Sequence, residues 1–94
     1  MEKDFEGKIT EVANGKNVTG IVCSDTQGMC LKARGVCSKK QAGVVTAIIE
    51  RAKELVSDTR TSRIDPIVIV EFQSRTIHFK YMKAITMAVH ENIS

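Results

Sequence analysis

Residues 18–28 decide the fold, and they read Val18-Thr19-Gly20-Ile21-Val22-Cys23-Ser24-Asp25-Thr26-Gln27-Gly28. The run from Val18 to Cys23 is rich in β-branched and apolar residues, which is typical of a strand inside a sheet. Asp25 favours the opening of a turn, and Gly28 supplies the positive φ that a turn needs near its close. The stretch therefore predicts a strand over residues 18–23 and a turn over residues 24–28.

Residues 29–34 alternate along the chain, as a second strand does. The alternation predicts two faces, with Met29, Leu31 and Ala33 on one and Cys30, Lys32 and Arg34 on the other. Gly35 ends this strand. Two adjacent strands joined by a short turn predict a β-hairpin over residues 18–34.

A long helix is predicted after this hairpin. Ser38-Lys39-Lys40-Gln41 has the S-x-x-Q form of a capping box, which marks a helix start. The helix is predicted to run to about Val56, before a polar loop over residues 57–63. Helical periodicity places a sheet-facing stripe around Val45, and the predicted solvent arc consists of Thr46, Glu50, Lys53, Glu54 and Ser57.

The apolar arc of this helix is wider than one sheet requires. Val44 and Ala47 extend the arc to about 220°, whereas a helix that covers one sheet needs a stripe of 100° or somewhat more. A second surface is therefore predicted to pack on the helix, lined by Val44, Ala47, Ile48, Arg51 and Leu55. The alternative is that Val44 and Ala47 are ordinary exposed apolar residues, which are common.

Three further strands are predicted in the second half of the chain, over residues 67–72, 76–81 and 85–90. One-sided apolar spacing also predicts a short helix over residues 5–13. This order of elements indicates an α+β fold, in which antiparallel hairpins are joined by one helical crossover. The chain has 94 residues, one Pro and six Gly, which predicts a single domain over residues 1–94.

The strand that begins at Ile67 is the second indication of a partner. It is apolar on both faces, and it follows Pro66, which is tolerated at the first residue of a strand. An uncovered hydrophobic edge is a template for pairing with another chain. The predicted partner edge consists of Ile67, Val68, Ile69, Val70 and Glu71. The alternative, that this strand lies inside the sheet, stays open from the sequence.

Composition excludes several other classes of protein. Fourteen Lys and Arg against eleven Asp and Glu give a net charge of +3, with both signs interspersed rather than clustered as in a duplex-binding module. No apolar run approaches the roughly 18 residues that span a bilayer. The charged start of the chain lacks a signal-peptide block. The sequence therefore predicts a soluble intracellular protein that binds no nucleic acid.

Catalytic and metal sites find little support in the sequence. Cys23, Cys30 and Cys37 lie seven residues apart, which is neither a zinc spacing nor an even set for disulfides, so three reduced thiols are predicted. His78 and His90 are the only imidazoles. A nucleophilic Cys/His pair needs a close base and a lowered thiol pKa, and no motif supplies either. We therefore expect no enzyme activity, no cofactor and no metal.

Three segments resemble one known family. Residues 18–28, the helix opening Ala42-Gly43-Val44-Val45 and the last strand Ile85-Thr86-Met87-Ala88-Val89-His90 are similar to the hepatitis B X-interacting protein family, the fifth subunit of the Ragulator complex. That family has a roadblock/dynein-light-chain-like fold. The resemblance implies a five-stranded antiparallel sheet in the order 2-1-5-4-3, with the long helix on one face. It also implies pairing through the long helix and the third strand.

The function implied by the resemblance is that of a non-catalytic scaffold. Its partners would be other Ragulator subunits, including a second roadblock-like subunit in a heterodimer, and Rag GTPases through the complex. The complex supports amino-acid signalling to the target-of-rapamycin kinase complex. The expected location is cytoplasmic, at the lysosomal or late endosomal surface, with membrane contact only through a lipidated subunit. The alternative is a homodimeric roadblock-type light chain of a motor or GTPase regulator.

The resemblance includes no helix after the last strand. The sheet face away from the long helix is therefore predicted to be solvated. This predicted outer face carries Lys32, Arg34, His78, Lys80 and His90.

Overall fold

The computed structural model describes residues 7, 11–12, 14–56 and 65–93. Its elements are β1 (Val18–Ser24), β2 (Cys30–Gly35), η1 (Lys39–Gln41), α2 (Ala42–Lys53), β3 (Ile67–Glu71), β4 (Arg75–Met82) and β5 (Ile85–Asn92). Most of the short helix predicted over residues 5–13 lies outside the described residues, as does all of the predicted loop over residues 57–63.

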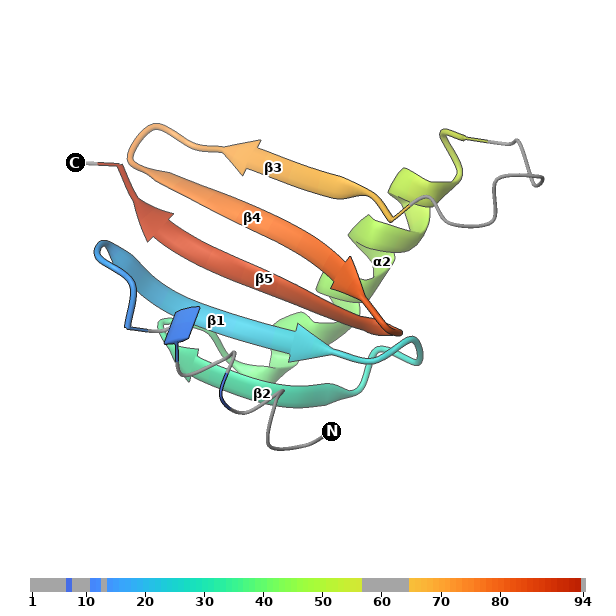
Figure 1. Ribbon diagram of the computed structural model, residues 1–94, viewed down its shortest axis with the longest axis horizontal. Helices are drawn as coiled ribbons and strands as arrows, with labels where there is room; N and C mark the ends of the chain where they lie inside the picture. Colours follow the sequence, from blue (N-terminus) through green and yellow to red (C-terminus); the bar gives the residue numbers. More distant parts are fainter. Residues whose placement is uncertain (1–6, 8–10, 13, 57–64, 94) are drawn as a thin grey trace.

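The five strands form one antiparallel sheet in the order β2-β1-β5-β4-β3 (Figure 1). This confirms the predicted sheet order. The last strand of the chain lies in the middle of the sheet, and β2 and β3 lie at its two edges. The edge position of β3 also decides between the two alternatives left open by the sequence.

The predicted turn between β1 and β2 is confirmed. Asp25 Oδ1 accepts hydrogen bonds from the backbone N–H groups of Gln27 and Met29, both at 2.9 Å. Gly28 has a φ of 84°, a conformation that costs glycine little and other residues more. The positions of Asp25 and Gly28 therefore determine where the turn forms.

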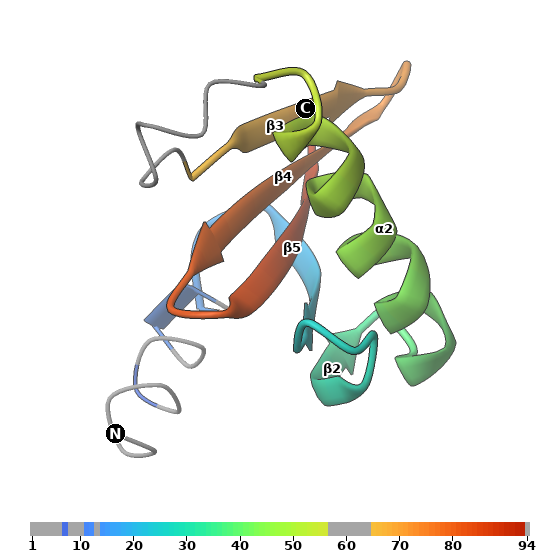
Figure 2. The ribbon, with the colours of Figure 1, turned by 90° about the vertical axis from the view of Figure 1, so that its right-hand side faces the viewer.

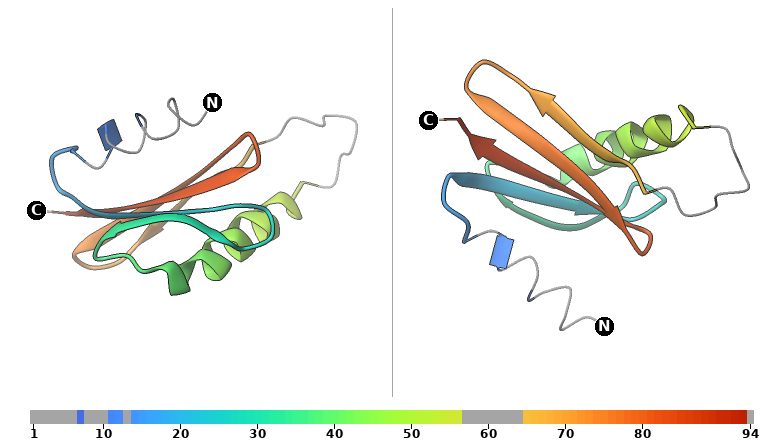
Figure 3. Two further views of the ribbon diagram at one scale, coloured as in Figure 1. Left: turned by 90° about the horizontal axis from the view of Figure 1, so that it is seen from below. Right: turned by 45° about the horizontal axis from the view of Figure 1, so that its top comes forward.

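α2 covers one face of the sheet (Figures 2 and 3). Val45 and Ile49 from the helix are buried against Val22, Phe79 and Ala88 from three different strands. Each large apolar side chain buried in this way stabilises the fold by roughly 1.5–3 kcal/mol. This cluster is the main core of the domain and fixes the position of the helix.

The start of the helical segment agrees with the sequence, and its end differs slightly. The backbone N–H of Ser38 donates to Gln41 Oε1 at 3.0 Å, which is one half of the predicted capping box. The segment begins as the 3₁₀ turn η1 and continues as α2. α2 ends at Lys53 rather than at Val56, and the chain continues in a hydrogen-bonded turn in which the Leu55 N–H donates to the Ala52 carbonyl.

The opposite face of the sheet is not the solvated surface that the sequence predicts. Ile21, Cys23 and Met87 are buried there, and Val12 and Val89 are among the apolar residues packed against them. The expected polar side chains lie toward the two edges of this face, with Lys32 and Arg34 on β2 opposite the buried Cys23 and Ile21, and two others on β4 next to β3. His78 and Lys80 lie there, and His78 Nε2 lies 3.4 Å from Glu91 Oε1.

His90 lies on the helix face, so its predicted place on the outer face is wrong. The cause is the hairpin turn at Lys83 and Ala84. A two-residue turn pairs positions of opposite parity, and His78 therefore lies opposite Val89 instead of His90. Because neighbouring residues of a strand point to opposite faces, His90 points toward α2.

β2 also departs from simple alternation. The register between β1 and β2 shifts by one residue between Cys23 and Ser24. As a result Cys30 and Ala33, predicted on opposite faces, both pack against the main core. A β-bulge of this kind resets which side chains face the interior.

Candidate protein interface

β3 presents an unpaired strand edge along most of its length. It pairs with β4 in an uninterrupted register from Ile67 opposite Lys80 to Glu71 opposite Thr76, and with no other described strand. Ile67 is 71% exposed and Ile69 is 55% exposed. Their side chains point away from α2, on the face that carries His78. The predicted partner edge is therefore an apolar, accessible edge strand.

The backbone of β3 shows which groups are free to pair. The Phe72 N–H donates to the Arg75 carbonyl oxygen at 2.7 Å, which closes the β3–β4 hairpin. Hydrogen bonding in an antiparallel pair alternates along each strand. The even-numbered residues of β3 therefore bond to β4, and the N–H and C=O groups of Ile67, Ile69 and Glu71 point outward. These outward groups can accept another strand.

The side chains of the predicted edge divide into two sets. Ile67, Ile69 and Glu71 are exposed. Val68 and Val70 are half-buried and pack against the main core beneath α2. The even positions thus hold β3 on its own domain, and the odd positions remain available to a partner.

The second predicted surface, on α2, is also exposed for the most part. Val44 is 61% exposed, and Ala47 and Arg51 lie on the outside of the helix. Ile48 is half-buried because it packs against the main core. Leu55 is 86% exposed and lies just beyond the end of the helix. Exposed apolar side chains of this size form a surface that another protein can cover.

Arg51 contributes little to the stability of the isolated chain. Its Nη1 lies 3.1 Å from Glu54 Oε1 in an exposed pair one helical turn apart. Such surface pairs contribute roughly 0–1 kcal/mol. The guanidinium therefore remains available for a contact outside the chain.

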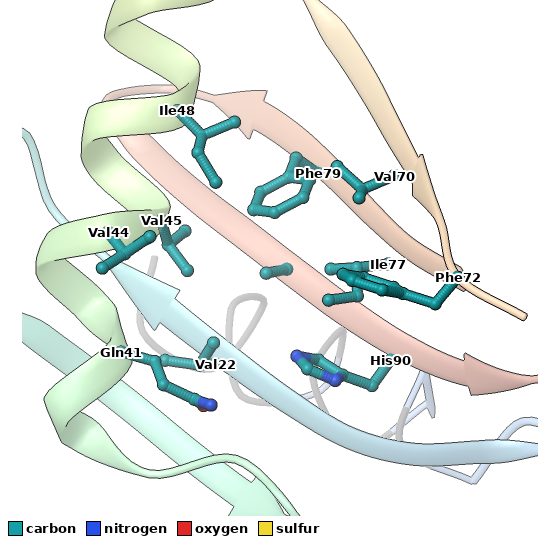
Figure 4. Close-up of a pocket in the computed structure, with 11 residues that line it drawn as sticks. Val22, Gln41, Val44, Val45, Ile48, Val70, Phe72, Ile77, Phe79 and His90 are labelled. Atoms are coloured by element: carbon teal, nitrogen blue, oxygen red, sulfur yellow. The ribbon is translucent and has the colours of Figure 1, made fainter. Parts of the chain in front are cut away.

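An apolar cleft lies between α2 and the β3–β4 hairpin (Figure 4). Its volume is about 260 Å³, and its walls include Val44 and Ile48 from the helix and Val70, Phe72 and Ile77 from the hairpin. Because Val44 borders the cleft on one side and Phe72 on the other, the cleft joins the helix surface to the edge strand. The cleft therefore connects the helix surface to the α2 side of β3 at Val70, while the side chains of Ile67 and Ile69 lie on the other face of the sheet.

His90 forms part of the cleft wall. It is only 6% exposed, and its Nδ1 is buried without a hydrogen-bond partner among the described residues. Burial lowers the pKa of His90, and the nearby positive charge of Arg75 lowers it further. The imidazole is therefore held neutral near pH 7, because both causes disfavour a second positive charge.

The geometry does not favour cysteine chemistry. Cys23 and Cys37 are buried and Cys30 is half-buried, and none of the three is in a disulfide. Burial raises the pKa of the Cys37 thiol, although Arg75 partly opposes the effect, so the reactive thiolate is disfavoured. In the described part of the chain, no three His, Cys, Asp or Glu side chains gather where they could hold a metal ion.

Three residues near this region were not identified from the sequence. Thr46, predicted on the solvent arc, is buried, and its Oγ1 lies 2.7 Å from Ser24 Oγ and 2.8 Å from the Asp25 carbonyl. The Thr46 hydroxyl therefore donates to the carbonyl and accepts from Ser24. Phe72 and His90 line the cleft. The only sequence signal for this cleft is the aromatic Phe72 at the end of an edge strand.

Comparisons with known proteins identify the family. The family model described as "Ragulator complex protein LAMTOR5" matches residues 1–91. The chain belongs to this family. A LAMTOR5 homologue from Nematostella vectensis is 33% identical over 91 residues, which are 97% of each chain. The LAMTOR5 protein of Xenopus laevis is 29% identical over 91 residues, again 97% of each chain. The predicted resemblance is confirmed at the level of the LAMTOR5 family.

A solved structure confirms the fold independently. The roadblock/LC7 domain from Streptomyces avermitilis superposes with a TM-score of 0.74 over 89% of this chain and 73% of that chain. The two sequences are 14% identical, so this similarity concerns the fold alone. In the part of the LAMTOR5-family chain that the structure describes, no helix is both long and apolar enough to cross a membrane.

Proposed function

We propose that this chain is a non-catalytic scaffold subunit of a Ragulator complex. It pairs with a second roadblock-like subunit through α2 and the free edge of β3. The observation that carries the proposal is the continuity of these two surfaces in a chain of the LAMTOR5 family. A subunit whose role is to assemble with other subunits needs an exposed apolar surface. In this chain α2 and the edge of β3 provide such a surface.

The outward backbone groups of β3 give the pairing its geometry. A partner strand added at Ile67, Ile69 and Glu71 extends the sheet across the two subunits, and main-chain hydrogen bonds fix its register. The exposed face of α2 then lies against the partner on the same side of the extended sheet. Burial of Val44 and Leu55 in this contact supplies the apolar contribution to affinity.

The wider role follows from the complex. As part of a Ragulator complex, the chain supports recruitment of Rag GTPases at the lysosomal or late endosomal surface and amino-acid signalling to the target-of-rapamycin kinase complex. It reaches the membrane only through a lipidated subunit. Its own contribution is to hold its partner in place, and it needs no cofactor.

Val44→Glu tests the proposed interface most simply. Val44 is mostly exposed in the isolated chain, so we expect the free energy of unfolding in urea to change by less than about 0.5 kcal/mol. An unpaired charge buried in the complex costs roughly 3–5 kcal/mol, which weakens association by two to four powers of ten. Isothermal titration calorimetry with the companion roadblock-like Ragulator subunit measures this affinity.

Leu31→Glu is the matched control. Leu31 is 43% exposed on β2, at the other edge of the sheet, and receives the same apolar-to-acidic change. We expect it to bind the companion subunit as the unchanged chain does. Equal binding by Val44→Glu would contradict the proposal. A stable homodimer in light scattering that ignores the companion subunit would instead favour a homodimeric light chain.

A further inference from the structure

The helix surface assigned to the partner carries positive charge around its apolar centre. Lys40, Val44, Ala47 and Arg51 follow one another at spacings of three or four residues along the continuous helical segment of η1 and α2, and all four are exposed. Residues at these spacings share one face of a helix. We call these four residues the α2 stripe. The stripe has a cation near each end, Lys40 and Arg51, and contains no acidic residue.

The two acidic residues in and just after α2 leave this charge unbalanced. Glu50 pairs with Lys53, with 3.1 Å between Glu50 Oε2 and Lys53 Nζ, on the side of the helix turned away from the stripe. Glu54 borders the stripe, and its Oε1 lies 3.1 Å from Arg51 Nη1. Lys40 has no ion pair among the described residues. The stripe therefore has an uncompensated positive charge.

The sheet beside the stripe adds a further cation. Arg75 lies on β4 two residues before Ile77, whose side chain lines the cleft, so both point to the α2 side of the sheet. Burial lowers the pKa of His90 in the cleft wall, and the charge of Arg75 lowers it further, which places Arg75 near the cleft. Glu71 and Glu91 lie on the other face of the sheet. Among the described residues, the partner-facing side therefore has a surplus of positive charge.

This charge opposes the pairing of two identical chains. A two-fold axis brings the same surface of each chain against the other. If the two α2 helices run antiparallel, Lys40 of one chain faces the end of the other stripe that carries Arg51. If they run parallel, each cation faces its own copy. Like charges meet in both arrangements, and like charges across an interface oppose association.

We propose that the charge of the α2 stripe selects a partner subunit whose facing helix carries carboxylates, and that the same charge prevents the chain from pairing with itself. This inference rests on the proposed function, because it concerns the surface assigned to the partner. Carboxylates opposite Lys40 and Arg51 replace the repulsion with attraction, while Val44 and the cleft supply apolar contact (Figure 4). Specificity of this kind combines attraction for one partner with repulsion of another.

A charge-reversed copy of the chain tests the proposal without a companion subunit. In the double variant Lys40→Glu/Arg51→Glu the stripe becomes acidic, and its apolar residues are unchanged. Mixed with the unchanged chain at an ionic strength of about 0.05 M, the variant should dimerise with it at least about tenfold more tightly than either protein does alone. Sedimentation equilibrium measures the three dissociation constants. The difference should shrink at about 0.5 M salt, because salt screens exposed charges.

The double variant Lys16→Glu/Arg34→Glu is the matched control. It makes the same two changes of residue type and net charge at exposed positions before β1 and on β2. Because neither residue lies on the stripe, this variant should bind the unchanged chain no more tightly than the unchanged chain binds itself. The urea midpoints of both double variants should stay close to that of the unchanged chain, since all four positions are exposed.

Binding of the companion roadblock-like subunit gives a second measurement. Calorimetry with the unchanged chain should show an affinity that falls about tenfold or more between about 0.05 M and about 0.5 M salt. At the lower salt concentration, Lys40→Glu/Arg51→Glu should bind the companion subunit at least about tenfold more weakly than the unchanged chain does.

Two results would overturn this inference. One is a mixture of the unchanged chain with Lys40→Glu/Arg51→Glu that associates no more tightly than either protein alone or than the control mixture. The other is binding of the companion subunit that neither salt nor the charge reversal changes. If Val44→Glu still weakens that binding, the proposed interface stands and only its selection by charge is wrong.

Discussion

The two edges of the sheet differ in how they are protected. β2 carries Lys32 and Arg34, its register with β1 shifts at Cys23, and it ends at a glycine with positive φ. β3 pairs with β4 in uninterrupted register, and Glu71 is its only charge. Charges and bulges are the usual means by which proteins prevent edge pairing. By this criterion β2 is the closed edge of the sheet and β3 is its open edge.

The largest expected effect concerns the closed edge. Gly35 has a φ of 65°, and an added Cβ there would overlap the Thr19 carbonyl oxygen. Because both the backbone conformation and the space exclude a side chain, Gly35→Ala should lower the free energy of unfolding by about 3–5 kcal/mol. Urea denaturation of the isolated chain measures this change.

Gly43→Ala is the matched control for this substitution. A Cβ at Gly43 meets nothing within 4 Å, and the residue lies in α2. The same chemical change should there raise the stability by about 0.5–1 kcal/mol, since alanine favours the helix. Equal effects at the two glycines would show that the β2 end is not constrained as described.

Proline substitutions on β3 separate its two sets of backbone groups. Val70→Pro removes an N–H that bonds to β4, and it should lower the free energy of unfolding by about 2–3 kcal/mol. Ile69→Pro removes an outward N–H, so it should lower stability by about 1 kcal/mol or less and weaken partner binding about tenfold or more. Urea titration and calorimetry measure the two quantities. Reversed effects would mean that β3 presents its even positions to the outside.

The smallest expected effect lies between the edges, at the β4–β5 hairpin. Lys83 and Ala84 both have positive φ, of 49° and 67°, where residues other than Gly and Asn are strained. Ala84→Gly should therefore raise the free energy of unfolding by about 0.5–1 kcal/mol. Ala47→Gly, on the exposed side of α2, should lower it by about as much. In the stabilised Ala84→Gly background, destabilising substitutions at the β2 and β3 edges could be compared while the chain remains folded.

Much of the fold could be predicted from local patterns. The apolar run after Pro66, with no polar face, and the wide apolar arc of the helix predicted β3 and α2 as the two surfaces for a partner. The turn at Asp25 and Gly28 followed from its residue types. These features are determined by residues that lie close together in the sequence, so short-range patterns are sufficient to predict them.

The remaining features depend on contacts between distant residues. The face of His90 is set by the length of the hairpin turn at Lys83, which reverses the parity of paired positions. From the sequence alone, Thr46 cannot be distinguished from a solvent-exposed polar residue. Only the fold places Ser24 of β1 beside it. The cleft exists because α2 leaves part of the β3–β4 hairpin uncovered, which no single segment encodes.

Amide hydrogen exchange tests the central claim, that a partner adds to the β3 edge, most directly. NMR measures it residue by residue in the isolated chain and in the complex with the companion roadblock-like subunit. The account predicts that the amides of Ile67, Ile69 and Glu71 exchange quickly in the isolated chain and at least about tenfold more slowly in the complex, while β2 is unchanged. Unchanged exchange at these three amides, or new protection at β2 instead, would contradict it.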